Sequence, residues 1–313
     1  GLLLESLGAP LDDAKAERPG VYLTNSLTGW EPPKEKPKQD LLSFPELAEE
    51  RDAAAKVKME KPILVVLGNP PYNAFAGVSP DEEGDLVGAY KQGLVADWKI
   101  KKFNLDDLYI RFFRLAEMRI AEHGGRGVVS FISNSSWVTE TSYVVMRRHL
   151  LGSFDRVWIE NLHGNRKITE YAPDGRTSET IFAQSGFSAG IQIGVATSLL
   201  VCTGKKQAPV IRFRDDLHAA KADERRQQLI TSITAADFNA QYQNATPDLS
   251  NRYCFRPSDV GLAYLGWPKL SDFCSVAPVN GLMEKRGGAL IDDSRAALTE
   301  RMQRYFDRGV SFD

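Results

Sequence analysis

The sequence predicts an α/β fold with a doubly wound sheet, and three observations lead to this prediction. Short, continuously apolar segments rich in β-branched residues alternate with longer segments whose apolar residues have helical spacing. Glycines and other turn residues separate these segments. The order strand, helix, strand, helix, strand between residues 62 and 162 is typical of parallel sheets covered by helices. With 313 residues, the chain is long enough for two domains.

The first part of the chain leads into a strongly apolar segment. Residues 20–27, GVYLTNSL, are β-prone and predict a short strand, and residues 29–40 form a loop rich in Pro and Lys. Residues 41–61 have the composition of an amphipathic helix. Residues 62–68, PILVVLG, are continuously apolar, which predicts a strand that is buried on both faces of a parallel sheet.

Further helices and strands complete the predicted alternation. In chain order they are a helix over residues 105–124, a strand over 127–133, a helix over 142–153 and a strand over 154–162. Residues 178–186 and 190–204 predict two strands in an antiparallel hairpin at the edge of the sheet. A charged helix is expected over residues 215–233. Because the composition changes after residue 204, we expect a domain boundary between residues 205 and 206.

Composition limits the classes of function. The net charge of −2 gives no overall basic signature for nucleic acid, although a basic groove can occur on a nearly neutral molecule. Three widely spaced cysteines indicate free thiols in a reducing compartment, not a zinc site or a disulfide framework. No apolar run is long enough to span a membrane, so we expect a cytoplasmic protein. Four histidines, which have no metal-ligand spacing, are expected on the surface or in loops: His123, His149, His163 and His218.

The most informative motif is NPPY, Asn69-Pro70-Pro71-Tyr72, directly after the apolar segment of residues 62–68. Two consecutive prolines end regular hydrogen bonding, because proline has no N–H. In open α/β sheets, ligands bind beyond the carboxyl ends of the strands. There, the Asn69 amide and the Pro70 carbonyl can accept hydrogen bonds from an amino group, and Tyr72 can stack on a planar ring. Such acceptors suit the transfer of a group to a weakly nucleophilic nitrogen.

In this context, NPPY resembles motif IV of the S-adenosylmethionine-dependent amino-methyltransferases, above all the DNA adenine-N6 methyltransferases of the gamma-type motif order. Other segments look like further motifs of that family: residues 21–30 like motif III, residues 104–113 and 127–138 like motifs V and VI, and residues 190–201 like the strand near motif VIII. The chain is similar to the methyltransferase part of large single-polypeptide restriction–modification enzymes. The resemblance is strongest over residues 65–203 and implies a partial Rossmann-like methyltransferase sheet.

The resemblance also implies roles for particular residues. S-adenosylmethionine would be the cofactor, and the substrate would be an adenine that is flipped out of duplex DNA. Asn69, Pro70, Pro71 and Tyr72 would form the catalytic segment, in which Asn69 and the Pro70 carbonyl bind the N6 amino group and Tyr72 stacks on the base. Asn69 and Asn25 would also meet the cofactor. Asn25 has an alternative role, because Asn often caps a turn.

Two basic segments are candidates for contact with double-stranded DNA. Lys285 and Arg286 precede two glycines, which allows close approach to a phosphate, and they lie in a segment that looks like the start of a target recognition region. Arg166 and Lys167 lie in a basic loop, for which a solvated surface loop is the alternative. The expected partners are therefore DNA and the upstream nuclease and ATPase domains of the same longer polypeptide.

The sequence departs from the family in one respect, because no glycine-rich cofactor loop, motif I, precedes the motif III-like segment. Residues 1–205 are therefore expected to be a methyltransferase catalytic domain without its motif I segment. Residues 206–313 are expected to begin a mixed α+β target recognition domain. Two alternatives stay open: a non-catalytic DNA-binding or scaffold fragment, and a methyltransferase that acts on RNA or on protein glutamine, since similar motifs serve those substrates.

Overall fold

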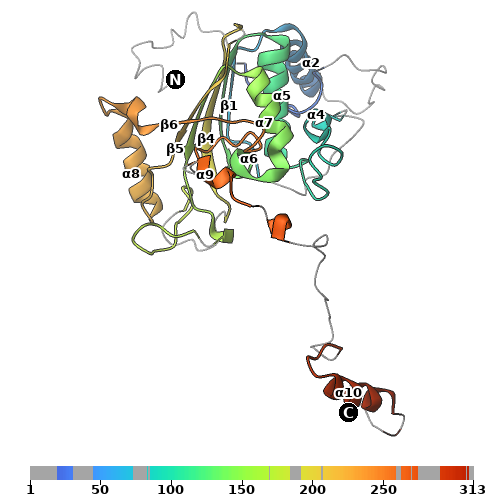
Figure 1. The fold of residues 1–313 in the computed structure, drawn as a ribbon. Helices are drawn as coiled ribbons and strands as arrows, with labels where there is room; N and C mark the ends of the chain where they lie inside the picture. The colour runs from blue at the N-terminus through green and yellow to red at the C-terminus, as the bar shows by residue number, and fades with distance from the viewer. Residues whose placement is uncertain are drawn as a thin grey trace, which may run out of the picture. The chain divides into compact units, whose positions relative to one another are not determined.

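The computed structural model of the chain describes residues 20–30, 45–72, 83, 85–168, 170–183, 192–205, 207–258, 262–268, 270–273, 290–307 and 309. The chain divides into two units, Gly1–Ser258 and Asp259–Asp313 (Figure 1). The second unit contains three short elements among its described residues: α9 (Leu262–Leu265), η5 (Leu270–Phe273) and α10 (Arg295–Phe306). The Ser294 hydroxyl accepts a hydrogen bond from the N–H of Ala297 and so caps α10.

A six-stranded mixed sheet forms the centre of the first unit (Figure 1). In spatial order, its strands are β1 (Val65–Gly68), β2 (Gly127–Asn134), β4 (Val195–Cys202), β3 (Arg156–Asn161), β5 (Val210–Arg214) and β6 (Gln243–Ala245). β1, β2, β3 and β5 run parallel to one another, whereas β4 and β6 run antiparallel to their neighbours. The sheet confirms the predicted α/β class.

Helices lie on both sides of this sheet. In chain order, they are α2 (Pro45–Glu60), α4 (Gly88–Lys91), α5 (Leu108–Glu117) with its π-helical continuation η1 (Met118–His123), α6 (Ser136–Thr139), η2 (Thr141–Tyr143), α7 (Val144–Ser153), η3 (Arg166–Ile168), α8 (Ala222–Ile233) and η4 (Phe238–Gln241). α2, α4, α5 and α7 lie on one side, and α8 lies on the other side beside β5 (Figure 1). No helix of the described part of the chain is both long and apolar enough to cross a membrane.

The main hydrophobic core lies between the sheet and α5, α6 and α7. Phe113 of α5 packs edge to face on Phe131 of β2, with 5.1 Å between ring centroids, and also contacts Trp137 of α6 at 4.9 Å. All three side chains are nearly inaccessible to solvent. The helical spacing of apolar residues in α5 and the alternation in β2 place these rings in one layer. The core therefore fixes β2, which leads into the carboxyl edge of the sheet.

β1 differs from the prediction, because it is not buried on both faces. Val66 packs against the main core, whereas the side chains of Val65 and Leu67 are 63% and 79% exposed. Within the described residues, β1 pairs only with β2, so it is an edge strand. A continuous apolar run is typical of a central strand, but the run itself does not specify whether another strand or helix covers it.

Three strand predictions differ from the structure. Of the predicted strand over residues 178–186, residues 178–183 do not form a strand, and residues 184–186 lie outside the described residues. β4 lies between β2 and β3 in the middle of the sheet, not in a hairpin at its edge. Residues 20–27 contain a bend and a turn but no strand. The β-branched composition of such segments gives a strand preference, but pairing partners decide whether a strand forms and where it lies.

The first unit extends beyond the boundary that we expected between residues 205 and 206. β5 pairs in parallel with β3, so the sheet itself continues past that position. Phe255 is fully buried against Trp137, with 5.7 Å between ring centroids. The expected boundary thus lies inside the first unit, which ends at Ser258.

Arg147 of α7 joins the segment around residue 252 to the rest of the unit. Its fully buried guanidinium donates hydrogen bonds to the carbonyl oxygens of Trp137, Glu140 and Arg252, at 2.9, 2.8 and 3.0 Å. Burial lowers the pKa of the Arg147 guanidinium. These three described partners are all neutral, so Arg147 acts by satisfying buried carbonyl groups.

We expect Arg147→Met to destabilise the first unit, because it leaves three carbonyl oxygens without their donor. The free energy of unfolding should fall by about 2–4 kcal/mol, as measured by urea denaturation followed through tryptophan fluorescence. Arg148→Met is the matched control, because Arg148 is the exposed neighbour on the same helix. Its effect should stay within about 0.5 kcal/mol. Equal effects of the two variants would contradict the role of Arg147.

We expect the apolar edge at β1 to make the chain self-associate as its concentration rises, because edge strands without charged side chains pair with other strands. Leu67→Lys should reduce this association in sedimentation velocity measurements. Ile233→Lys is the control, since Ile233 is 64% exposed on α8, away from the sheet edge. The idea fails if Ile233→Lys reduces association as much as Leu67→Lys does.

Candidate functional site

The NPPY segment leaves the carboxyl end of β1, as predicted from the sequence. Pro70 is buried and anchors the segment, whereas Asn69 and Pro71 are exposed and Tyr72 is half-buried. Because β1 and β2 are parallel, this segment lies at the sheet edge where β2 also ends. The Asn69 amide is therefore accessible at the edge where open α/β sheets bind ligands.

Tyr72 orients the Asn69 side chain. The Tyr72 hydroxyl donates a hydrogen bond to Oδ1 of Asn69 at 3.3 Å. Its ring meets Tyr109 edge to face, with 6.3 Å between centroids. Burial raises the pKa of Tyr72 to about 12, so its phenol is protonated at neutral pH and can donate. One lone pair of Asn69 Oδ1 stays available for an amino group.

A second hydrophobic cluster also supports Tyr72. This cluster contains Leu162, Ile181, Val195 and Leu217, and Tyr72 packs against it as well as against the main core. Contacts with two clusters restrict the ring of Tyr72 more than contacts with one. The segment after β1 thus holds a rigid aromatic ring beside an oriented amide.

The structure does not bring Asn25 to Asn69. Oδ1 of Asn25 accepts a hydrogen bond from the N–H of Leu27 at 3.0 Å, which is the turn-capping alternative considered from the sequence. Lys58, in the last turn of α2, donates to the carbonyl oxygen of Asn25 at 2.6 Å. Since α2 leads directly into β1, Asn25 lies at the amino end of β1, opposite to Asn69.

Lys58 and Trp30 hold this amino-terminal segment in place. Lys58 also donates to the Thr24 hydroxyl and to the Thr28 carbonyl oxygen, both at 2.8 Å, and burial lowers its pKa. The guanidinium of Arg119 lies 4.7 Å from the centroid of the Trp30 ring, in a cation–π contact. The described contacts of this segment are therefore structural.

The predicted DNA-binding residues are placed only in part. Arg166 is exposed in η3, in the loop that follows β3, and its N–H donates to the carbonyl oxygens of Gly164 and Gln192. Lys167 also belongs to η3. Lys285 and Arg286 lie outside the described residues. Arg166 therefore lies at the same edge of the sheet as Asn69, but it follows a different strand.

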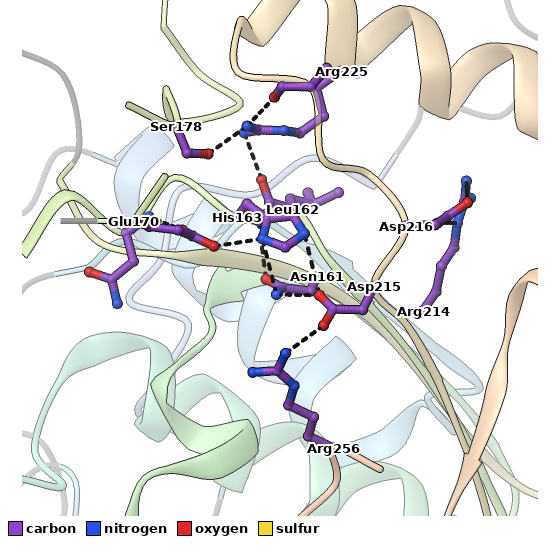
Figure 2. Close-up of polar contacts among 12 residues, drawn as sticks. Asn161, Leu162, His163, Glu170, Ser178, Arg214, Asp215, Asp216, Arg225 and Arg256 are labelled. Atoms are coloured by element: carbon purple, nitrogen blue, oxygen red, sulfur yellow. Dashed lines mark hydrogen bonds and ion pairs between the residues drawn. The ribbon is translucent and has the colours of Figure 1, made fainter. Parts of the chain in front are cut away.

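The structure assembles a polar cluster at this edge that the sequence patterns did not predict. Figure 2 shows His163 between two carboxylates: its Nδ1 lies 2.6 Å from Glu170 Oε1, and its Nε2 lies 3.3 Å from Asp215 Oδ1. Asp215 also accepts hydrogen bonds from Asn161 Nδ2 and from Arg256 Nη2, both at 2.8 Å. His163 lies in the loop after β3, in agreement with the expected surface or loop position, but it is only 8% exposed.

Long sequence separations explain why this cluster was missed. Asn161 and Asp215 are 54 positions apart, so no local spacing connects them. The available signal was the occurrence of polar residues directly after two apolar strand segments, β3 and β5, which are parallel neighbours. The backbone of His163 is in the left-handed region, with a φ of 55°, which turns its side chain back toward the strand ends.

Arg225 of α8 positions the loops that carry the cluster (Figure 2). It is fully buried and donates to the carbonyl oxygen of Leu162 at 2.9 Å and to the Ser178 hydroxyl at 2.6 Å. Its Nη1 also donates to the carbonyl oxygen of Glu179. Burial lowers the pKa of the Arg225 guanidinium. This residue links α8 to the loop that precedes His163.

A cavity of about 130 Å³ opens beside the cluster, at the carboxyl ends of β2, β3 and β5. The residues that line it include Ser135, Asn161, Asn165, Glu170, Phe213 and Arg256. Among the described residues, no group of histidine, cysteine and carboxylate side chains is arranged to bind a metal ion. Cys202 and Cys254 are free thiols, and Cys274 lies outside the described residues.

We expect Glu170→Gln to destabilise the chain in a pH-dependent way. Burial opposes ionisation of Glu170, but hydrogen bonds from His163 and from the Asn165 N–H outweigh it and lower the carboxyl pKa. The ionised carboxylate therefore contributes stability above its unfolded pKa of about 4.3 and loses that contribution as the pH falls. The variant should lose about 1 kcal/mol at pH 7, and this difference should shrink between about pH 5 and pH 3.

Thermal and urea unfolding at several pH values measure this difference. Glu224→Gln is the control, because the Glu224 side chain is 55% exposed and its Oε2 lies 3.8 Å from Nη2 of its ion-pair partner, Arg176. It should change stability little at any pH. A Glu170→Gln effect that does not depend on pH would contradict the ionic contribution.

The fold resembles parts of three solved structures. The ATP-dependent Type ISP restriction-modification enzyme LlaBIII bound to DNA has a TM-score of 0.55 and 22% identity, over 69% of this chain and 14% of that chain. A nuclease-deletion mutant of the Type ISP enzyme LlaGI, in complex with a DNA substrate mimic, has a TM-score of 0.56 and 20% identity, over 82% and 24% of the two chains. A DrdV–DNA complex has a TM-score of 0.52 and 26% identity, over 68% and 20%.

These likenesses concern the fold, and this chain spans only 14 to 24% of the length of those proteins. No protein-family model matches the chain, and no curated protein matches it in sequence. The mixed α/β sheet described above is therefore a fold that this chain shares with a part of DNA-bound restriction–modification enzymes.

Proposed function

We propose that this chain is the site-specific DNA adenine-N6 methylating portion of a restriction–modification protein. In this proposal, S-adenosylmethionine donates a methyl group to the amino nitrogen of an adenine that is flipped out of the duplex. The observation that carries the proposal is the NPPY segment at the carboxyl end of β1, where Tyr72 orients the exposed amide of Asn69.

Asn69 and Pro70 would act on the amino group by accepting one hydrogen bond each from its two N–H bonds. Oδ1 of Asn69 already accepts from Tyr72 and has a second lone pair, and the Pro70 carbonyl follows directly in a rigid segment. Two fixed acceptors hold the amino nitrogen in one orientation and increase its electron density. Pro71 would keep the chain extended, and the ring of Tyr72 would pack against the base. The proton of the amino group would leave to solvent.

In this proposal, Asn69 would contact S-adenosylmethionine as well as the amino group. Asn25 uses its side-chain oxygen in a turn at the amino end of β1, and the sequence before it has no glycine-rich loop. The outer edge of β1, which would border a ligand next to Asn69, has no described partner strand.

The nature of the substrate is supported by the likeness to DNA-bound enzymes. LlaBIII and LlaGI are Type ISP restriction-modification enzymes whose structures were determined with DNA or a DNA mimic. One is ATP-dependent, and the other was studied as a nuclease-deletion mutant. This supports duplex DNA as the partner and nuclease and ATPase parts in the same polypeptide. Arg166 and Lys167, and Lys285 and Arg286 in the region proposed for target recognition, would contact its phosphates.

A second candidate function is DNA binding without methyl transfer. It is favoured by the exposed position of Arg166, since binding to phosphates needs only exposed cations. Methylation of RNA or of protein glutamine is the remaining alternative from the sequence. All of these functions can be separated by measuring transfer of labelled methyl groups to duplex DNA, RNA and protein.

We expect Asn69→Ala to lower the rate of methyl transfer to adenine in duplex DNA by about 100-fold or more, because positioning of the amino group is lost. Tyr72→Phe keeps the ring and should have a smaller effect. Asn244→Ala is the control, since Asn244 is exposed on β6. Mass spectrometry of the methylated base is the readout. Full activity of Asn69→Ala would refute the proposal, and salt-dependent DNA binding without any transfer would favour the second function.

A further inference from the structure

The cavity at the ends of β2, β3 and β5 is separate from the NPPY segment. None of the four NPPY residues lines it, and β2 and β4 separate β1 from β3 in the sheet. Its volume is about 130 Å³. A cavity of about 150 Å³ in another protein holds a benzene ring. The cavity is therefore suited in size to one planar six-membered ring.

One wall of the cavity offers hydrogen-bond acceptors. Oδ1 of Asn165 is buried and has no hydrogen-bond partner among the described residues. The carboxylate of Glu170 lies beside it and accepts a hydrogen bond from the Asn165 N–H at 2.7 Å. Buried polar atoms are nearly always hydrogen-bonded, so the free acceptor calls for a donor. A ligand that carries an N–H group at this position would supply it.

The rest of the lining combines polar side chains with apolar ones. Val138, Ala196 and Phe213 are buried and line the cavity, and Ile168 lines it with a side chain that is 72% exposed. Apolar side chains on several sides suit the faces of a flat ring. The ligand indicated by these walls is a planar ring with an amino group on its edge.

The charges around the cavity disfavour an anion. Glu170 and Asp215 are carboxylates, and the cation Arg256 is paired with Asp215 at 2.8 Å. His163 lies between the two carboxylates (Figure 2). A phosphate in the cavity would meet the repulsion of these carboxylates, whereas a neutral amino group would meet acceptors. The preferred ligand is therefore neutral.

We propose that this cavity binds cytosine, a one-ring nucleobase that carries an exocyclic amino group, outside the helical stack. The inference rests on the proposed function in one respect, because it takes nucleic acid to be bound at this edge of the sheet. None of the four NPPY residues lines the cavity, so the base in it is a second base, distinct from the one at Asn69.

Arg166 would contact the backbone of the same nucleotide. It lies one position after Asn165 in the chain and two positions before Ile168, and both of these residues line the cavity. Its exposed position allows a phosphate contact outside the cavity. Base recognition inside and phosphate contact outside is the usual division in nucleic-acid binding. The cavity would therefore contribute to the choice of sequence, and Arg166 to affinity.

Saturation-transfer NMR with the whole chain and millimolar free nucleosides tests this inference. The probes are 2′-deoxycytidine, 2′-deoxyadenosine and thymidine, which has no amino group. We expect a signal from 2′-deoxycytidine and at most several-fold weaker signals from 2′-deoxyadenosine, whose two-ring base exceeds the cavity, and from thymidine. Asn165→Leu removes the free acceptor and should reduce the 2′-deoxycytidine signal at least several-fold, whereas Asn165→Asp, which keeps an acceptor, should retain it.

Ile168→Trp gives a second, independent variant. It should block the cavity with little effect on folding, because Ile168 is 72% exposed. Ile233→Trp is the matched control at an exposed position of α8. Circular dichroism and thermal unfolding verify that each variant is folded.

The outcomes separate this inference from the proposed function. Binding that is lost in Asn165→Leu and Ile168→Trp but kept in Asn69→Ala and Ile233→Trp supports a base site in the cavity, whatever the methylation assay gives. Absence of nucleoside binding to the unaltered chain overturns the inference. So does binding that survives both cavity variants, or binding that is lost only in Asn69→Ala.

Discussion

The position of β4 is the constraint on which the rest of the first unit depends. β4 runs antiparallel between β2 and β3, and it pairs along its whole length with β2, from Val195 opposite Asn134 to Cys202 opposite Gly127. Because β4 runs in the opposite direction, its beginning lies next to the ends of β2 and β3. Gly194, directly before β4, is buried and lines the cavity together with residues after those two strands. One antiparallel strand thus gathers the loops of the candidate base site.

Buried arginines connect the loops to this sheet. Arg147 binds three carbonyl oxygens, and Arg225 binds carbonyl oxygens and one hydroxyl group. A buried cation is costly, so each guanidinium is surrounded by acceptors that also need donors. Loops cannot satisfy all of their own carbonyl groups, as helices and strands do. The arginines therefore allow irregular segments to be buried beside the site, where Arg225 supports the loop of His163 and Glu170.

The two proposed base positions use different chemistry at the same edge of the sheet. At Asn69, an exposed amide and a proline carbonyl are available, and Tyr72 supplies a ring. In the cavity, a buried amide oxygen lies among polar and apolar side chains, next to the carboxylate of Glu170. The exposed acceptors at Asn69 suit an amino group that reacts, because such a group must also be reached by the methyl donor. The cavity suits recognition, since a buried unpaired acceptor discriminates strongly between ligands with and without a donor.

Sequence alone determined the α/β class, most helices, the strands near residues 127–133 and 154–162, and the place of NPPY after a strand, because these depend on local patterns. Only the tertiary structure decided that β1 has one partner strand among the described residues, that β4 is central, and that the first unit continues to Ser258. It also placed Asn25 in a turn and His163 between Glu170 and Asp215. These features arise from pairing and packing between segments that are far apart in the chain. The local periodicity of a segment does not specify which distant segment it contacts.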